Sequence, residues 1–208
     1  LILEKNNQVG GLVHCGNTIS SLSSNIVKNL NINLPKSTKP SYVVALDPNQ
    51  NHTVIEEKQE DIILHATSAD QESQKQFKQL INKYKKFSSS LSEFMNNTPP
   101  RLKSGESKDT WQLLKMGWNI RRLGKRNMRE FLRVIGLNIA DELEDSLTDD
   151  TLKGLFAHEA ILGSNLGPRS PGSVLTLLYK QAIQEGLLFN SEKYNYHEFI
   201  PSLEKMCL

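Results

Sequence analysis

The sequence lacks the features that mark membrane-spanning, disulfide-bonded and metal-binding proteins. Of its 208 residues 38% are hydrophobic, and no apolar run approaches the roughly 20 residues that span a bilayer. Its two cysteines, Cys15 and Cys207, lie far apart, which argues against a disulfide framework. The histidines do not have the spacing of metal ligands, so we expect no metal site.

A large excess of charge is also missing. Lysine and arginine number 25 against 23 aspartates and glutamates, and the net charge of +2 argues against a general nucleic-acid partner. No segment has the charged start, apolar middle and small-residue cleavage site of a signal peptide. The scarcity of cysteine fits a reducing compartment, and we expect the cytoplasm or an organelle matrix such as that of mitochondria.

The opening residues are the most informative part of what is present. Residues 1–3 have the pattern of a buried apolar strand, and the carboxylate of Glu4 follows directly. An acid at the carboxyl end of a parallel strand accepts both ribose hydroxyls in dinucleotide-binding βαβ units. Gly10 and Gly11 come next, where a backbone without side chains can pass close to a pyrophosphate. An ordinary strand followed by a polar turn would explain the same residues.

The rest of the chain divides into a small sheet and a series of helices. A helix is expected at 22–30, and β-rich segments follow at 41–46, 52–55 and 61–65. Apolar residues at three- and four-residue spacing predict a long helix between a capping box at Ser68 and the double proline Pro99-Pro100. Further helices are expected within 111–147, with breaks at Gly124 and Gly136, and at 152–162 and 174–182.

A rigid loop at residues 163–172 separates the last two helices. Three glycines and two prolines restrict its path, and Arg169 carries its only charge. Such a loop beside apolar helices can form one wall of a pocket. A structural turn whose arginine pairs with a nearby acid such as Glu159 is the alternative.

Several segments together resemble one enzyme family. They are Phe131-Leu132-Arg133, Ala140-Asp141-Glu142-Leu143, Leu152-Lys153-Gly154-Leu155, Ala160-Ile161-Leu162-Gly163, Gly167-Pro168-Arg169-Ser170-Pro171-Gly172 and Leu175-Thr176-Leu177-Leu178-Tyr179. Their order and spacing look like the phytoene-dehydrogenase-related FAD-dependent oxidoreductases. Within these, the chain resembles the branch named after pyridine nucleotide-disulfide oxidoreductase domain-containing protein 2. The opening, the Asp47-Pro48 turn and the double proline fit the same pattern over residues 1–180.

The resemblance implies an α/β protein with a partial glutathione-reductase-like FAD domain and a substrate domain, α+β in character, built as a small sheet covered by helices. It implies FAD as the cofactor and hydride transfer from a small lipophilic substrate to the flavin. In this interpretation Glu4 matches the ribose-binding acid, and Gly10 and Gly11 match the glycine pair near the pyrophosphate. No catalytic residue can be carried over. The residues expected on the substrate side are Gly167, Pro168, Arg169 and Ser170.

The same resemblance predicts the domain organisation. Residues 1–40 are expected to be the remnant of the FAD domain, residues 41–182 the substrate domain, mostly helical from residue 68, and residues 183–208 a divergent tail. In this pattern the glycine-rich phosphate turn belongs before residue 1, so we expect the sequence to be an internal piece of a larger protein and to be inactive alone. The alternatives are a truncated or decayed non-enzymatic copy, a helical interaction module, and an amine-oxidase-like flavoprotein.

A basic stretch at residues 115–133 is interleaved with tryptophan and leucine. Its cations are Lys115, Arg121, Arg122, Lys125, Arg126, Arg129 and Arg133. An interfacial helix that docks an enzyme on anionic lipid has this composition, so the stretch predicts peripheral membrane contact. A solvated basic helix paired with acids is the alternative; those acids would be Asp141, Glu142, Glu144 and Asp145.

Overall fold

The computed structural model describes residues 24–34, 40–47, 52–58, 61–66, 71–95, 99–101, 105–184 and 186–189, together with residues 202 and 205. The described residues form seven helices and one three-stranded antiparallel sheet, so the predicted mixed α/β class is confirmed. The strand predicted at residues 1–3, which belongs to the expected FAD domain, lies outside the described residues. Among the described helices, none has the length and apolarity required to cross a bilayer.

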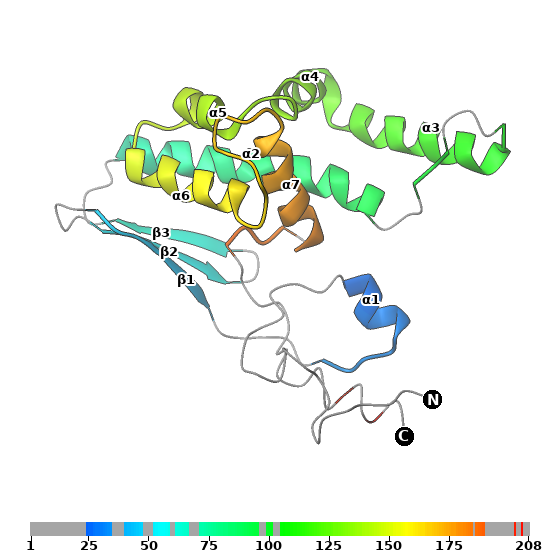
Figure 1. Cartoon of the computed structure of the whole chain (residues 1–208), viewed down its shortest axis with the longest axis horizontal. Coiled ribbons are helices and arrows are strands. Elements are labelled where there is room, and N and C mark those ends of the chain that lie inside the picture. The colour runs from blue at the N-terminus through cyan, green and yellow to red at the C-terminus, as the bar shows by residue number, and fades with distance from the viewer. Residues whose placement is uncertain are drawn as a thin grey trace.

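The sheet has the strand order β1-β2-β3, and each strand is antiparallel to the next (Figure 1). Its strands are β1 (Ser41–Ala45), β2 (Thr53–Lys58) and β3 (Asp61–Ala66). All three predicted strands are therefore confirmed. Residues paired across the strands point to the same face of a sheet. Val43, Ile55 and Leu64 are paired in register and pack in the core, so this is the covered face.

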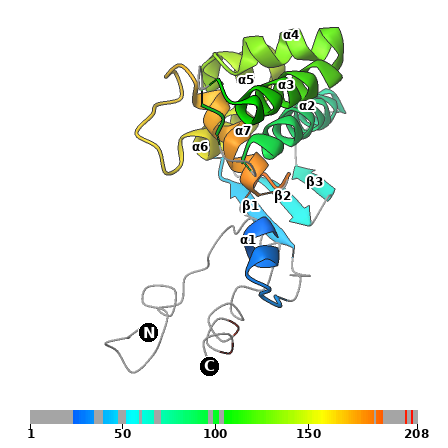
Figure 2. The same ribbon diagram turned by 90° about the vertical axis from the view of Figure 1, so that its right-hand side faces the viewer.

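The helices α2 to α7 lie together on the covered side of the sheet, whereas α1 lies apart from them (Figure 1 and Figure 2). Their bounds are α1 (Ser24–Asn29), α2 (Gln71–Met95), α3 (Ser107–Arg122), α4 (Gly124–Val134), α5 (Ile139–Ser146), α6 (Asp150–Ile161) and α7 (Ser173–Ile183). Leu123 separates α3 from α4, and Gly124 begins α4 with a φ of 81°, a conformation that favours glycine, so the predicted break is confirmed.

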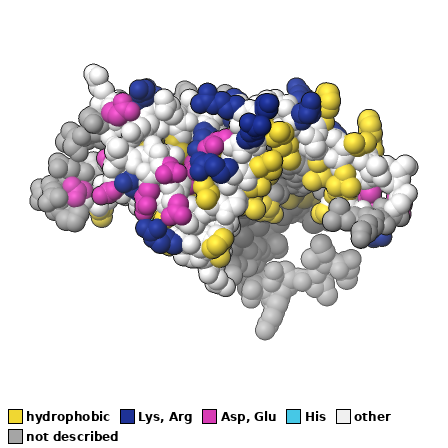
Figure 3. Space-filling view, turned by 90° about the horizontal axis from the view of Figure 1, so that it is seen from above, with side chains coloured by type: hydrophobic (Ala, Val, Ile, Leu, Met, Phe, Trp, Pro, Cys, Tyr) yellow, Lys and Arg dark blue, Asp and Glu magenta, His cyan; other side chains and the backbone are white. Residues whose placement is uncertain are grey.

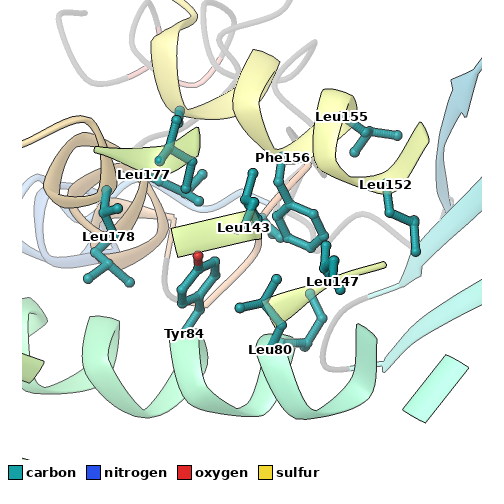
Figure 4. Close-up of a cluster of buried hydrophobic side chains, with 14 of the residues drawn as sticks. Leu80, Tyr84, Leu143, Leu147, Leu152, Leu155, Phe156, Leu177 and Leu178 are labelled. Atoms are coloured by element: carbon teal, nitrogen blue, oxygen red, sulfur yellow. The ribbon is translucent and has the colours of Figure 1, made fainter. Parts of the chain in front are cut away.

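The core lies between α2, α6, α7 and the sheet. The ring of Phe156 on α6 contacts those of Phe77 and Tyr84 on α2, with centroids 6.0 and 6.2 Å apart. Figure 4 shows the labelled side chains of α2 pointing toward those of α6, which confirms the apolar stripe predicted for the long helix. Phe189 also contacts Phe156, at 5.6 Å between centroids. The core therefore includes residues beyond position 182.

A buried carboxylate joins the segment after α7 to the sheet. Glu57 on β2 is fully buried, and its oxygens accept hydrogen bonds from the backbone N–H groups of Leu188 and Phe189 at 2.7 and 2.8 Å. An ionised acceptor holds a backbone donor more strongly than a neutral one. Glu57 therefore fixes the path of the chain where it returns from α7 to β2.

We expect Glu57→Ala to lower the free energy of unfolding by about 3 kcal/mol, because it leaves two buried N–H groups without their acceptor. Urea denaturation measures the change. The matched control is Glu72→Ala on the exposed first turn of α2, whose pair with Lys75 is solvated and contributes about 0–1 kcal/mol. Equal effects of the two substitutions would contradict the structural role of Glu57.

Candidate functional site

The predicted site residues fall into two groups. Glu4, Gly10 and Gly11 lie outside the residues that the structure describes, so the FAD contacts stay a prediction. The loop at residues 163–172 is described, and it connects α6 to α7. Only this second group can be examined in three dimensions.

The loop is fixed to the start of α5 by hydrogen bonds. The N–H of Ala140 donates to the carbonyl of Pro168 at 3.1 Å, and the N–H of Ile139 donates to the hydroxyl of Ser173 at 2.8 Å. Within the loop, the N–H of Gly167 donates to the hydroxyl of Ser170 at 3.0 Å. These contacts satisfy backbone donors at the N-terminus of α5, where a helix has no partners of its own. The loop therefore acts as a brace between α5 and α7.

Arg169 projects from this brace onto two acids of α5. Its guanidinium donates to Asp141 at 3.2 Å and to Glu144 at 2.7 Å, on the exposed surface. Glu159, the partner proposed from sequence, makes other contacts: it is nearly buried on α6, and Lys180 Nζ donates to its backbone carbonyl at 2.7 Å. The alternative predicted that Arg169 forms an ion pair, and it does. Its partners are Asp141 and Glu144, however, and not Glu159. The charge of Arg169 is already compensated.

The face of the sheet that points away from the helices carries apolar and polar groups. We define this open sheet face by Tyr42, Val44, Val54, Glu56, Ile63 and His65. The side chains of Tyr42, Val44 and Ile63 are about half exposed, at 59%, 49% and 47%. An antiparallel sheet that faces water normally presents polar side chains there. The open sheet face is therefore a candidate binding surface.

A carboxylate and an imidazole lie side by side on the open sheet face. His65 Nε2 is 2.9 Å from Glu56 Oε2, and the hydroxyl of Tyr42 donates to Glu56 Oε1 at 3.5 Å. A hydrogen bond at this distance needs one proton between the two groups, and the imidazole has a second ring nitrogen, Nδ1, besides the one in this contact. This pair can take up a proton from a bound molecule.

A second candidate is a groove of about 970 Å³ between α2 and α4, which we call the basic groove. Its cations are Lys83, Lys86, Lys125, Arg126, Arg129 and Arg133. Six cations around one concave surface attract anions, because their fields add within the groove. The sequence predicted only the α4 wall. The signal for the α2 wall is the spacing of Lys83 and Lys86 on one side of the long helix.

Two of the six cations form ion pairs with acids of α4 and α5. Lys83 contacts the fully buried carboxylate of Glu142, and Arg133 donates to it at 3.4 Å. Glu130 lies 3.4 Å from Lys83 and 2.8 Å from Arg133. The hydrogen bond between Arg133 and Glu130 lowers the pKa of Glu130 and raises that of Arg133. These four residues form one network that joins α2, α4 and α5.

The other cations of the groove have no ion pair with a described acid. They are Lys86, Lys125, Arg126 and Arg129. Of the seven cations in the basic stretch at 115–133, Arg133 alone pairs with described acids, which include Glu142 and Asp145. Asp141 and Glu144 pair with Arg169 instead. The alternative of a basic helix paired with these acids is therefore correct for Arg133 alone among the described contacts. The basic groove consequently has more cations than acids to pair with them.

We expect Lys83→Met to lower the free energy of unfolding by about 3 kcal/mol, because the buried carboxylate of Glu142 loses its closest cation. Lys125→Met is the matched control in the same groove, and we expect it to change stability by less than about 0.5 kcal/mol. The double variant Lys83→Met/Glu142→Leu should recover most of the loss, since it removes the unpaired charge. Thermal or urea unfolding that shows no difference between Lys83→Met and its control would refute the role of the network.

Burial raises the pKa of Glu159 above 4.5, although Lys180 and His158 act in the opposite direction. Its ionised form is therefore less favourable in the folded than in the unfolded protein. This penalty is absent below about pH 4 and appears as the pH rises through the folded pKa. We expect Glu159→Gln to stabilise the protein at pH 7 relative to wild type, but not at about pH 4. Urea unfolding at both pH values tests this, with the exposed Glu72→Gln as the control. A pH-independent effect would be the contrary result.

Comparison with known proteins adds no relative to this description. No family model, no curated protein and no solved structure matches the chain. A functional conclusion therefore depends on the residues and surfaces described above, together with the resemblance found in the sequence.

Proposed function

We propose that this chain is the substrate-domain part of an FAD-dependent oxidoreductase of the phytoene-dehydrogenase-related type. The enzyme would transfer a hydride from a lipophilic substrate to the flavin. One observation carries the proposal beyond the sequence: the sheet is covered by helices on one face, while its other face exposes apolar side chains beside the Glu56–His65 pair. The helices over one face support the small sheet covered by helices that the resemblance implies for the substrate domain.

The composition of the open sheet face supports a lipophilic ligand. Tyr42, Val44, Val54 and Ile63 form its apolar part, and Leu46, just beyond β1, is 76% exposed. An apolar patch on a folded domain costs free energy in water unless a ligand or another domain covers it.

The cofactor would be held by residues outside the described part of the chain. Glu4 would bind the ribose of FAD, and Gly10 and Gly11 would allow the backbone to approach its pyrophosphate. When bound, the flavin accepts the hydride. The described residues contribute an apolar surface that excludes water, and the Glu56–His65 pair can hold the proton that leaves the substrate. Gly167, Pro168, Arg169 and Ser170 would brace the helices behind that surface.

The native gene product that contains this sequence tests the proposal. We expect the purified protein to be yellow, with the absorption bands of bound flavin, and to lose FAD on Glu4→Ala. The control is Glu72→Ala, an exposed acid on α2. A colourless protein that cannot be reconstituted with FAD would overturn the proposal. If flavin is bound, product analysis separates carbon–carbon desaturation from amine oxidation, the chemistry of the nearest alternative.

A further inference from the structure

Helix α3 presents an apolar stripe to solvent. It has no buried residue, and Trp111, Leu114 and Trp118 are 71%, 60% and 64% exposed. Their spacing of three and four residues places them on one side of the helix. Tryptophan and leucine at such exposure lose the favourable free energy that burial of their apolar surface would give. The stripe therefore needs a partner that covers it.

Positive charge surrounds this stripe. Lys115 and Arg122 follow Trp111 and Trp118 by one helical turn each, so they lie beside the stripe on α3. Beyond Gly124, the basic groove begins on α4. Figure 3 shows lysines and arginines gathered next to exposed apolar side chains on the face seen from above. The partner must therefore combine an apolar layer with negative charge.

We propose that this face docks on the surface of an anionic lipid bilayer. The stripe Trp111, Leu114 and Trp118 enters the headgroup region, and the basic groove binds lipid phosphates. The indole ring suits this depth, because its apolar body and its N–H donor match a layer between hydrocarbon and water. Cations beside an apolar helical stripe then add electrostatic attraction to the bilayer.

Charge favours this partner over a second copy of the chain. A second copy of the chain would bring two basic surfaces together, and like charges oppose that contact. Four cations of the groove have no described acid as a partner, so they can bind phosphate without first breaking an ion pair. The inference goes beyond the proposed oxidoreductase and does not require a flavin.

Intrinsic fluorescence tests the proposal directly, because Trp111 and Trp118 are the only two tryptophans in the sequence. We expect their emission to shift to shorter wavelength with vesicles of phosphatidylcholine and phosphatidylserine. Vesicles of phosphatidylcholine alone should give little change. The shift should reverse in high salt, which screens the attraction. Brominated acyl chains should quench the emission, since they report entry of the indoles into the bilayer.

Matched variants separate the two parts of the surface in a vesicle co-sedimentation assay. Arg129→Glu should lower the partition coefficient about tenfold, since each cation near an anionic surface contributes a several-fold gain. The control Lys58→Glu makes the same charge change at the exposed end of β2 and should have little effect. Likewise, Trp118→Ala should weaken binding. Its control is Tyr179→Ala, which removes an exposed aromatic side chain from α7 and should leave binding unchanged.

Two results would overturn the proposal. The first is partition to anionic vesicles that is absent or unaffected by Arg129→Glu. The second is binding of a single-stranded oligonucleotide without binding to vesicles, which would assign the tryptophans to base stacking. Circular dichroism spectra of each variant that match wild type show that the changes concern the surface and not the fold.

Discussion

The fully buried carboxylate of Glu142 is the interaction on which the helical layer depends. It brings Lys83 of α2 and Arg133 of α4 to the start of α5, so three helices meet at one acid. A carboxylate without water is stable there only while both cations remain. The same two cations line the basic groove, so two residues of the groove are fixed by a buried acid of the helical layer. Burial and the nearby Glu142 also raise the pKa of Tyr84, which keeps its phenol neutral.

The loop at 163–172 differs from the open sheet face and the α3 stripe in whether its side chains have partners within the protein. Arg169 and the loop at 163–172 satisfy one another and α5, so they contribute to the stability of the helical layer. In contrast, the open sheet face and the α3 stripe leave apolar side chains in water. Surfaces of the second kind are where ligands and partners bind. The proposed substrate surface and the proposed bilayer surface therefore lie on separate elements and can be disrupted independently.

Local pattern predicted the elements well, because burial selects one stripe of a helix or one face of a strand. The α2 stripe from Phe77 to Phe87 and the strand at 41–46 are examples. Long-range polar contacts could not be predicted in this way. Glu57 accepts hydrogen bonds from N–H groups that lie 131 and 132 residues away in the sequence. Its spacing of two residues from Ile55 predicts that both side chains lie on the same face of the sheet, but it does not predict these partners. Similarly, the basic groove requires α2 and α4 to lie side by side. The residues predicted to hold FAD lie outside the described part of the chain.

The left-handed conformation of Gly124 has a consequence for the motion of α3. This helix contributes no fully buried side chain, and the partly buried Ile120 is its contact with the core, so less packing energy opposes its separation from the layer than for α2. The junction formed by Leu123 and Gly124 can then serve as a hinge about which α3 swings while the core stays folded. Amide hydrogen exchange along α3 would accordingly be faster than in α2. The segment would behave as a tethered arm whose orientation is set by what it touches.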